Sequence, residues 1–139
     1  MTAAIPVPQG HYRPAMRHGA IIYTSGMTPR VQGRLVASGP VRADVPLEDY
    51  RDAVVLACSN ALTAARAQLA EGEALAAVLT LSVFIAAEPG FTAHARLADF
   101  ASHYLQSELG ADGVGARAAI GVATLPGNAP VEVQLTAAV

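Results

Sequence analysis

The sequence predicts an α+β domain in which one β-sheet carries two helices on one face. Two observations predict it. Two segments with helical periodicity, 46–69 and 93–109, alternate with short runs rich in β-branched residues, and the chain ends in two more strand-like runs. The expected order is β-β-α-β-α-β-β, which suits two layers around one core. With 139 residues, 53% of them hydrophobic and 14% charged, a single domain over 1–139 is expected.

Local signals place the elements of the first half. β-Branched and aromatic residues predict a strand over 20–25, and a central glycine predicts a hairpin over 30–36. Pro46 begins the first helix, two acidic residues occupy its first turn, and Gly72 ends it. The β-branched run 78–85 predicts a buried strand.

The second half repeats the pattern. Thr92 is the expected N-cap of a helix over 93–109, and Gly110 is its stop. Two apolar strands follow, 116–124 and 131–138, separated by a Pro-Gly-Asn turn that suggests a hairpin. A sheet covered by helices on one side leaves its other face apolar, so a homo-oligomer is expected.

Each terminal strand carries one charge, Arg117 and Glu132, among residues typical of a core. A buried charge is costly unless it is paired, so both need partners, and a small polar ligand is one candidate. If the strands pair as a hairpin, Arg117 lies opposite Ala138 and Glu132 opposite Ala123, all on one face. The two charges are then roughly 20 Å apart at ~3.3 Å per residue. We therefore expect a working pair to join two subunits.

Composition excludes several classes of function. The net charge is −2 and all nine cationic side chains are arginine, which leaves no electrostatic footprint for nucleic acid and no lysine for a Schiff base or pyridoxal cofactor. Cys58 is the only cysteine and falls in a helical apolar pattern, so it is interpreted as core. The four histidines lack metal-ligand spacing, and neither a metal nor a cofactor is expected.

Membrane insertion is not expected either, although the mean hydropathy is +0.36. The longest apolar run, 74–87, is interrupted by polar residues and is shorter than the ~20 residues of a spanning helix. The N-terminus lacks the basic and apolar blocks of a secretory signal, so a cytoplasmic location is expected.

The chain resembles the Rid/YjgF family, the reactive intermediate deaminases, nearly from end to end. The order and spacing of several short motifs carry the resemblance: Gly10-His-Tyr12, Tyr23-Thr-Ser25-Gly26-Met-Thr-Pro29, Gly33-Arg-Leu-Val36, Asn60-Ala-Leu62, Val83-Phe84-Ile85, Ala116-Arg117, Leu125-Pro126 and Val131-Glu132-Val133. The resemblance implies a chorismate-mutase-like fold, a homotrimer whose sheets form a central barrel, and ligand sites in clefts between subunits.

The resemblance also implies an activity: hydrolysis of enamine and imine acids such as 2-aminoacrylate or 2-iminobutyrate to 2-keto acids and ammonia, without a cofactor. Arg117 matches the arginine that grips the substrate carboxylate, and Glu132 the residue that orients the attacking water. Tyr12 and Ser25 match polar residues of the substrate site, and Ala119 falls in it too. Ala119 and the preceding alanine replace the Ser-Cys of well-studied members, which points to a less characterised branch.

Alternatives remain open from the residues alone. Arg117 could be a salt-bridge residue, Glu132 its partner across an interface, and Ser25 a turn former. The chain could bind a small carboxylate without turnover. Ribonuclease activity is disfavoured by the charge balance. Chorismate-mutase-like catalysis would require a second cation in the pocket, and the sequence does not identify one.

Overall fold

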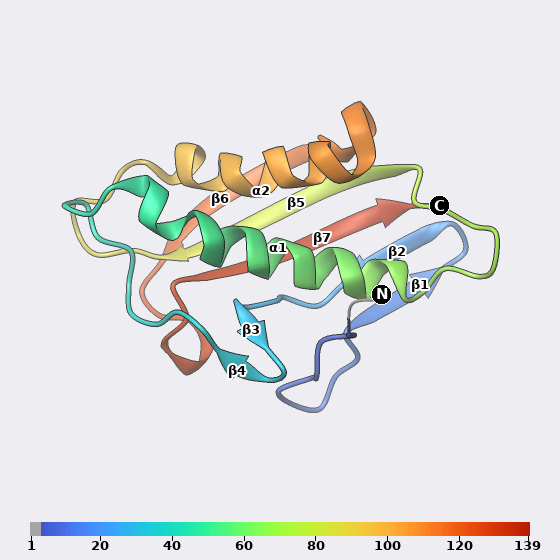
Figure 1. The fold of residues 1–139 in the computed structure, drawn as a ribbon, viewed down its shortest axis with the longest axis horizontal. Coiled ribbons are helices and arrows are strands. Elements are labelled where there is room, and N and C mark those ends of the chain that lie inside the picture. Colours follow the sequence, from blue (N-terminus) through green and yellow to red (C-terminus); the bar gives the residue numbers. More distant parts are fainter. Residues whose placement is uncertain (1–3) are drawn as a thin grey trace.

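The computed structural model describes residues 4–139 and contains one five-stranded sheet in the order β1-β2-β7-β5-β6 (Figure 1). β5 and β6 are parallel, and the other neighbours are antiparallel. A separate two-stranded hairpin, β3–β4, lies beside the sheet. The strands are β1 (Ala15–His18), β2 (Ile21–Thr24), β3 (Arg30–Val31), β4 (Arg34–Leu35), β5 (Ala77–Ala86), β6 (Ala116–Val122) and β7 (Val131–Ala138).

Both long helices, α1 (Arg51–Arg66) and α2 (His94–Leu109), lie across the same face of this sheet (Figure 1). The predicted fold class, an α+β domain with two helices on one face, is therefore confirmed. Alanines fill much of the inner face of α1, and Leu97 and Leu105 of α2 are completely buried. Small side chains allow a helix to lie close to a sheet, and the burial of the leucines supplies the apolar contact.

The ends of the helices differ in detail from the prediction. A short 3₁₀ segment, Leu47–Tyr50, precedes α1, and α1 ends at Arg66, before Gly72. Thr92 does not cap α2: the N-cap is Ala93, and no side chain makes a capping hydrogen bond there. Gly110 does end α2, with φ at +73°, a conformation that a residue with a Cβ adopts only with strain.

The predicted C-terminal hairpin is wrong. β6 and β7 each pair with β5, which lies between them. Parallel strands need a long crossover, and α2 supplies it between β5 and β6. β6 therefore takes one edge of β5, and the Pro126–Asn128 segment carries the chain past the end of β5 to its other edge.

The side chains of β7 separate cleanly between the two faces. Val131, Val133 and Leu135 are buried toward the helices, whereas Glu132 and Gln134 alternate onto the uncovered face. That uncovered face is mixed rather than wholly apolar, which corrects the expectation. Its exposed hydrophobic side chains include Met16, Tyr23 and Ile120, and its polar ones include Thr80, Gln134 and Thr136.

Candidate functional site

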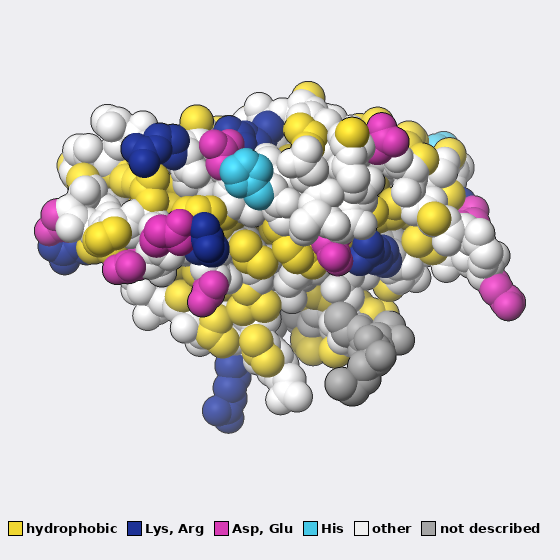
Figure 2. All heavy atoms as spheres, turned by 45° about the horizontal axis from the view of Figure 1, so that its top comes forward, with side chains coloured by type: hydrophobic (Ala, Val, Ile, Leu, Met, Phe, Trp, Pro, Cys, Tyr) yellow, Lys and Arg dark blue, Asp and Glu magenta, His cyan; other side chains and the backbone are white. Residues whose placement is uncertain are grey.

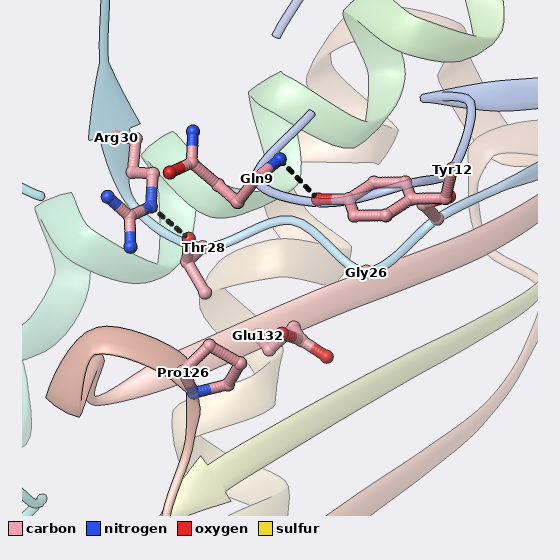
Figure 3. A pocket seen from close by; sticks show the side chains of 8 residues that line it. Gln9, Tyr12, Gly26, Thr28, Arg30, Pro126 and Glu132 are labelled. Atoms are coloured by element: carbon pink, nitrogen blue, oxygen red, sulfur yellow. Dashed lines mark hydrogen bonds between the residues drawn. The ribbon is translucent and has the colours of Figure 1, made fainter. Parts of the chain in front are cut away.

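A cavity of about 410 Å³ opens where the N-terminal segment, the loop after β2 and the start of β7 meet (Figure 3). It combines a carboxylate, a guanidinium, a phenol and several smaller polar groups. Its lining residues are Gln9, Tyr12, Ser25, Gly26, Thr28, Arg30, Pro126 and Glu132. Three of the predicted site residues, Tyr12, Ser25 and Glu132, are thus brought together by the fold of one chain.

Glu132 lies one residue after the start of β7 and is half-buried. Burial raises the pKa of its carboxyl above the ordinary value of 4.5, because the charged form loses solvation. The backbone of Gly26 passes directly over it, and a Cβ at residue 26 would lie 2.5 Å from Oε2 of Glu132. A carboxylate with a raised pKa at the wall of a cavity is suited to accept a proton from water.

Tyr12 and Ser25 line the same cavity but are already engaged in hydrogen bonds. The Tyr12 hydroxyl accepts a 3.0 Å hydrogen bond from the backbone N–H of Gln9, and its own proton is available for a ligand. The Ser25 hydroxyl donates to the carbonyl of Arg13 at 2.6 Å. Its only proton is therefore used within the chain, and Ser25 can offer a ligand only lone pairs.

Arg117 and Ala119 lie elsewhere, in an open depression beside α2 that also includes His94. The guanidinium of Arg117 donates to Asp99 at 2.7 Å, to the Ser102 hydroxyl at 3.1 Å and to the Ala95 carbonyl at 3.1 Å. The Arg117 side chain is 22% exposed and that of Asp99 49%. The charge on this strand thus has an ion-pair partner on α2.

Arg117 and Glu132 do not meet within one chain. Arg117 pairs with Leu81 of β5 and Glu132 with Phe84, so their strands flank β5 and their positions differ by three residues along it. With ~3.3 Å per residue and ~4.8 Å between strands, the two Cα atoms are about 14 Å apart. The side chains also point to opposite faces, since Arg117 contacts α2 and Glu132 faces away from the helices. The predicted shared face is therefore wrong.

Sequence reasoning missed Arg30, Thr28 and Gln9 as cavity residues. Arg30 occupies a short strand of the β3–β4 hairpin, and its Nε donates to the Thr28 hydroxyl at 3.0 Å (Figure 3). The hairpin itself was predicted, but nothing in its pattern showed that it folds over the start of β7. The second cation that the sequence did not identify is therefore present in the cavity.

The described part of the chain contains no cluster of three His, Cys, Asp or Glu side chains that could hold a metal ion. Cys58 is buried in the core, where desolvation raises the pKa of its thiol to about 12, so it is not a reactive nucleophile. No helix within residues 4–139 is long and apolar enough to cross a bilayer.

The comparisons with known proteins agree with this fold. A family model described as Endoribonuclease L-PSP matches residues 2–139, nearly the entire chain. The α+β fold and this match define a YjgF-like protein, and the chain belongs to that family, also called YjgF/Rid. The resemblance inferred from the sequence motifs is confirmed.

Individual relatives range from distant to moderately similar. A protein of unknown function from Agrobacterium tumefaciens is 32% identical, with a TM-score of 0.86 over 96% of this chain and 85% of that chain. Protein TCP17 of Trypanosoma cruzi is 28% identical over 131 residues, which are 94% of this chain and 82% of TCP17. E. coli TdcF, solved with bound serine, is 19% identical, with a TM-score of 0.61 over 99% of this chain and 94% of that chain.

Proposed function

We propose that this protein is a hydrolytic deaminase of reactive 2-imino or enamine acids, which it converts to 2-keto acids and ammonia. The observation that carries the proposal is the carboxylate of Glu132, held with a raised pKa at the wall of a cavity that Tyr12 also lines. Membership of the YjgF/Rid family supports a role in small-molecule chemistry. TdcF has the same fold and was solved with an amino acid bound, which is a ligand of the proposed size.

The reaction requires water, a positioned base and a cation for the substrate carboxylate. Glu132 accepts a proton from water as the water oxygen bonds to the C=N carbon of the protonated imine, and the π electrons of that bond move to nitrogen. The product of this step is a 2-amino-2-hydroxy acid. Glu132 then returns the proton to the amine. The C–N bond breaks with its electron pair going to nitrogen, ammonia leaves, and Glu132 accepts the hydroxyl proton to give the 2-keto acid; this proton then passes to ammonia, which departs as ammonium.

In this proposal the complete site is formed by two copies of the chain. One copy supplies the cavity with Glu132 and Tyr12, and the other supplies Arg117 to bind the substrate carboxylate bidentately. The separation of about 14 Å between Arg117 and Glu132, on opposite faces, excludes a small ligand held by both within one chain. The uncovered sheet face, with Met16 and Tyr23 half exposed, is the surface proposed to line the barrel of a homotrimer.

The alternative is a binding protein that holds a small carboxylate without turnover. Such a protein would use the same site but would need no general base. This alternative therefore predicts that replacing Glu132 does not weaken carboxylate binding. A ribonuclease is disfavoured, because Figure 2 shows acidic and basic side chains interspersed over the face it displays, and the net charge is −2.

The test is release of 2-keto acid from enzymatically generated 2-iminobutyrate and 2-aminoacrylate. Wild type is compared with Arg117→Ala and Glu132→Gln, and size-exclusion chromatography with light scattering confirms the assembly of each. The expected result is acceleration over the uncatalysed rate that falls about 10²–10⁴-fold in Glu132→Gln. Folded wild-type trimer without acceleration would contradict the deaminase proposal and favour the binding protein.

A further inference from the structure

The cavity contains a cation, Arg30, that makes no direct ion pair with any of the described residues. Arg30 is half-buried, and its Nε and Nη1 donate to two neutral oxygens, the Thr28 hydroxyl at 3.0 Å and the Gly33 carbonyl at 2.9 Å. Within residues 4–139 no carboxylate lies within 4.0 Å of its guanidinium. A partly buried charge normally has a counter-ion, so the missing partner of Arg30 is a candidate ligand.

Arg30 is also held in place by the rest of the fold. The side-chain amide of Asn60, on α1, donates to the carbonyls of Thr28 at 3.1 Å and of Arg30 at 3.0 Å. Pro29 between them is fully buried. On the far side, Nη2 of Arg30 lies against the turn before β7, 2.7 Å from where a Cβ of Gly127 would stand. The guanidinium is thus preorganised before a ligand arrives, which lowers the entropic cost of binding.

The hydrogen bonds of Arg30 within its own loop and hairpin use only some of its N–H donors. A guanidinium has five N–H donors, and the two bonds to Thr28 and Gly33 use one at Nε and one at Nη1. Within the described residues, no hydrogen-bond acceptor is paired with either N–H group of Nη2, so these donors remain able to bind an anionic group. The contacts within the hairpin thus leave part of the hydrogen-bonding capacity of Arg30 for a ligand.

Arg30 and Tyr12 lie at opposite ends of the cavity in Figure 3, with Glu132 on the wall between them. We infer that the preferred substrate is an imino acid with a second anionic group on its side chain, and that Arg30 binds this group. The inference rests on the proposed function, in which Arg117 of a neighbouring copy holds the carboxylate next to the C=N bond. Arg30 is then the residue that selects dianionic over monoanionic substrates.

The test compares two stable 2-oxo acids that differ in this group, 2-oxoglutarate and 2-oxobutyrate, by titration calorimetry on the assembled protein at constant ionic strength. Wild type is expected to bind 2-oxoglutarate at least about tenfold more tightly. Arg30→Gln is expected to lose this preference, because its affinity for 2-oxoglutarate falls much more than its affinity for 2-oxobutyrate. Arg30→Lys, which keeps the charge, is expected to retain part of the preference.

Arg34→Gln is the matched control, because Arg34 lies in the same hairpin but is exposed and does not line the cavity. Equal affinity of wild type for both acids, or an unchanged preference in folded Arg30→Gln, would overturn the inference. Loss of 2-oxobutyrate binding in Arg30→Gln would also overturn it, because Arg30 would then hold the carboxylate common to both. A charge preference without imine turnover would contradict the proposed function alone.

Discussion

Adding one methyl group at Gly26 tests whether the position of Glu132 matters, since the carboxylate itself is kept. In Gly26→Ala the new Cβ would lie 2.5 Å from Oε2 and 2.7 Å from Cδ of Glu132. Ordinary contact begins near 3.4 Å, so the carboxylate must move by about 1 Å. The end of a flexible side chain moves at little cost, and residue 26 has no positive φ, so the fold should survive. Misplacing a catalytic group by about 1 Å can cost on the order of 10²-fold in rate.

The assay measures kcat/KM for 2-iminobutyrate and the melting temperature for both variants of a matched pair. Gly10→Ala is the control, because its Cβ would meet only the Tyr12 ring, at an ordinary 3.4 Å. The expected result is a loss of about 10²-fold in kcat/KM for Gly26→Ala, near-wild-type melting, and little change for Gly10→Ala. An unchanged kcat/KM in Gly26→Ala would refute the claim that catalysis depends on the exact position of the Glu132 carboxylate beneath Gly26.

Three further predictions concern ionised groups. Glu132→Gln is expected to raise the melting temperature at pH 7, because burial destabilises the charged carboxylate in the folded state and so raises its pKa. Thermal melts should show this gain vanish as the pH falls below about 4.5, where the carboxyl is protonated in both the folded and the unfolded state. Glu73→Gln is expected to lower the melting temperature at pH 7, because the ion pair with Arg17 lowers the pKa of Glu73 to about 2. In the same melts this loss should disappear between pH 4.5 and about 2. Asp99→Asn is expected to tighten 2-oxobutyrate binding severalfold, as measured by calorimetry, because Asp99 would no longer compensate the charge of Arg117. Weaker binding would instead identify Asp99 as a residue that positions Arg117.

Much of the fold could be predicted because its signals are local. Helical periodicity located α1 and α2 to within a few residues, and the β-branched run of β5 was found directly. β1 was missed, since its four residues include Arg17 and His18 and show no clear alternation. The pairing of β6 with β7 was wrong because a turn signal is local, whereas the preference of β6 for the far edge of β5 depends on the crossover through α2.

The candidate site was only partly predictable for the same reason. Glu132 and Arg117 were recognisable as isolated charges on apolar strands, and the structure gives the latter an unexpected partner in Asp99. Arg30 carries no such signal, because a charged residue in a short exposed-looking hairpin is ordinary. Its position beside the cavity depends on Asn60, 30 residues away, which ties the hairpin to α1.

A site assembled from two copies makes a prediction that no single-chain site shares. Arg117→Ala and Glu132→Gln should each be inactive, yet assemblies containing both variants should regain activity. An interface is functional when the copy that supplies Arg117 is a Glu132→Gln chain and its neighbour is an Arg117→Ala chain. In the proposed cyclic trimer, random mixing at equal amounts makes about one quarter of the interfaces functional.

The measurement is kcat per chain for mixed assemblies, obtained by coexpressing the two variants with different tags and purifying by both tags in turn. Purification by both tags removes assemblies that contain only one variant. Each remaining trimer has one functional interface of three, so its activity should be about one third of wild type. If Arg117 and Glu132 act within one chain, every site lacks one of them and mixing restores nothing. The fold does not allow such a site, because Arg117 and Glu132 lie on opposite faces of the sheet. If mixing nevertheless restored no activity, Arg117 would act only as a structural partner of Asp99 within its own chain.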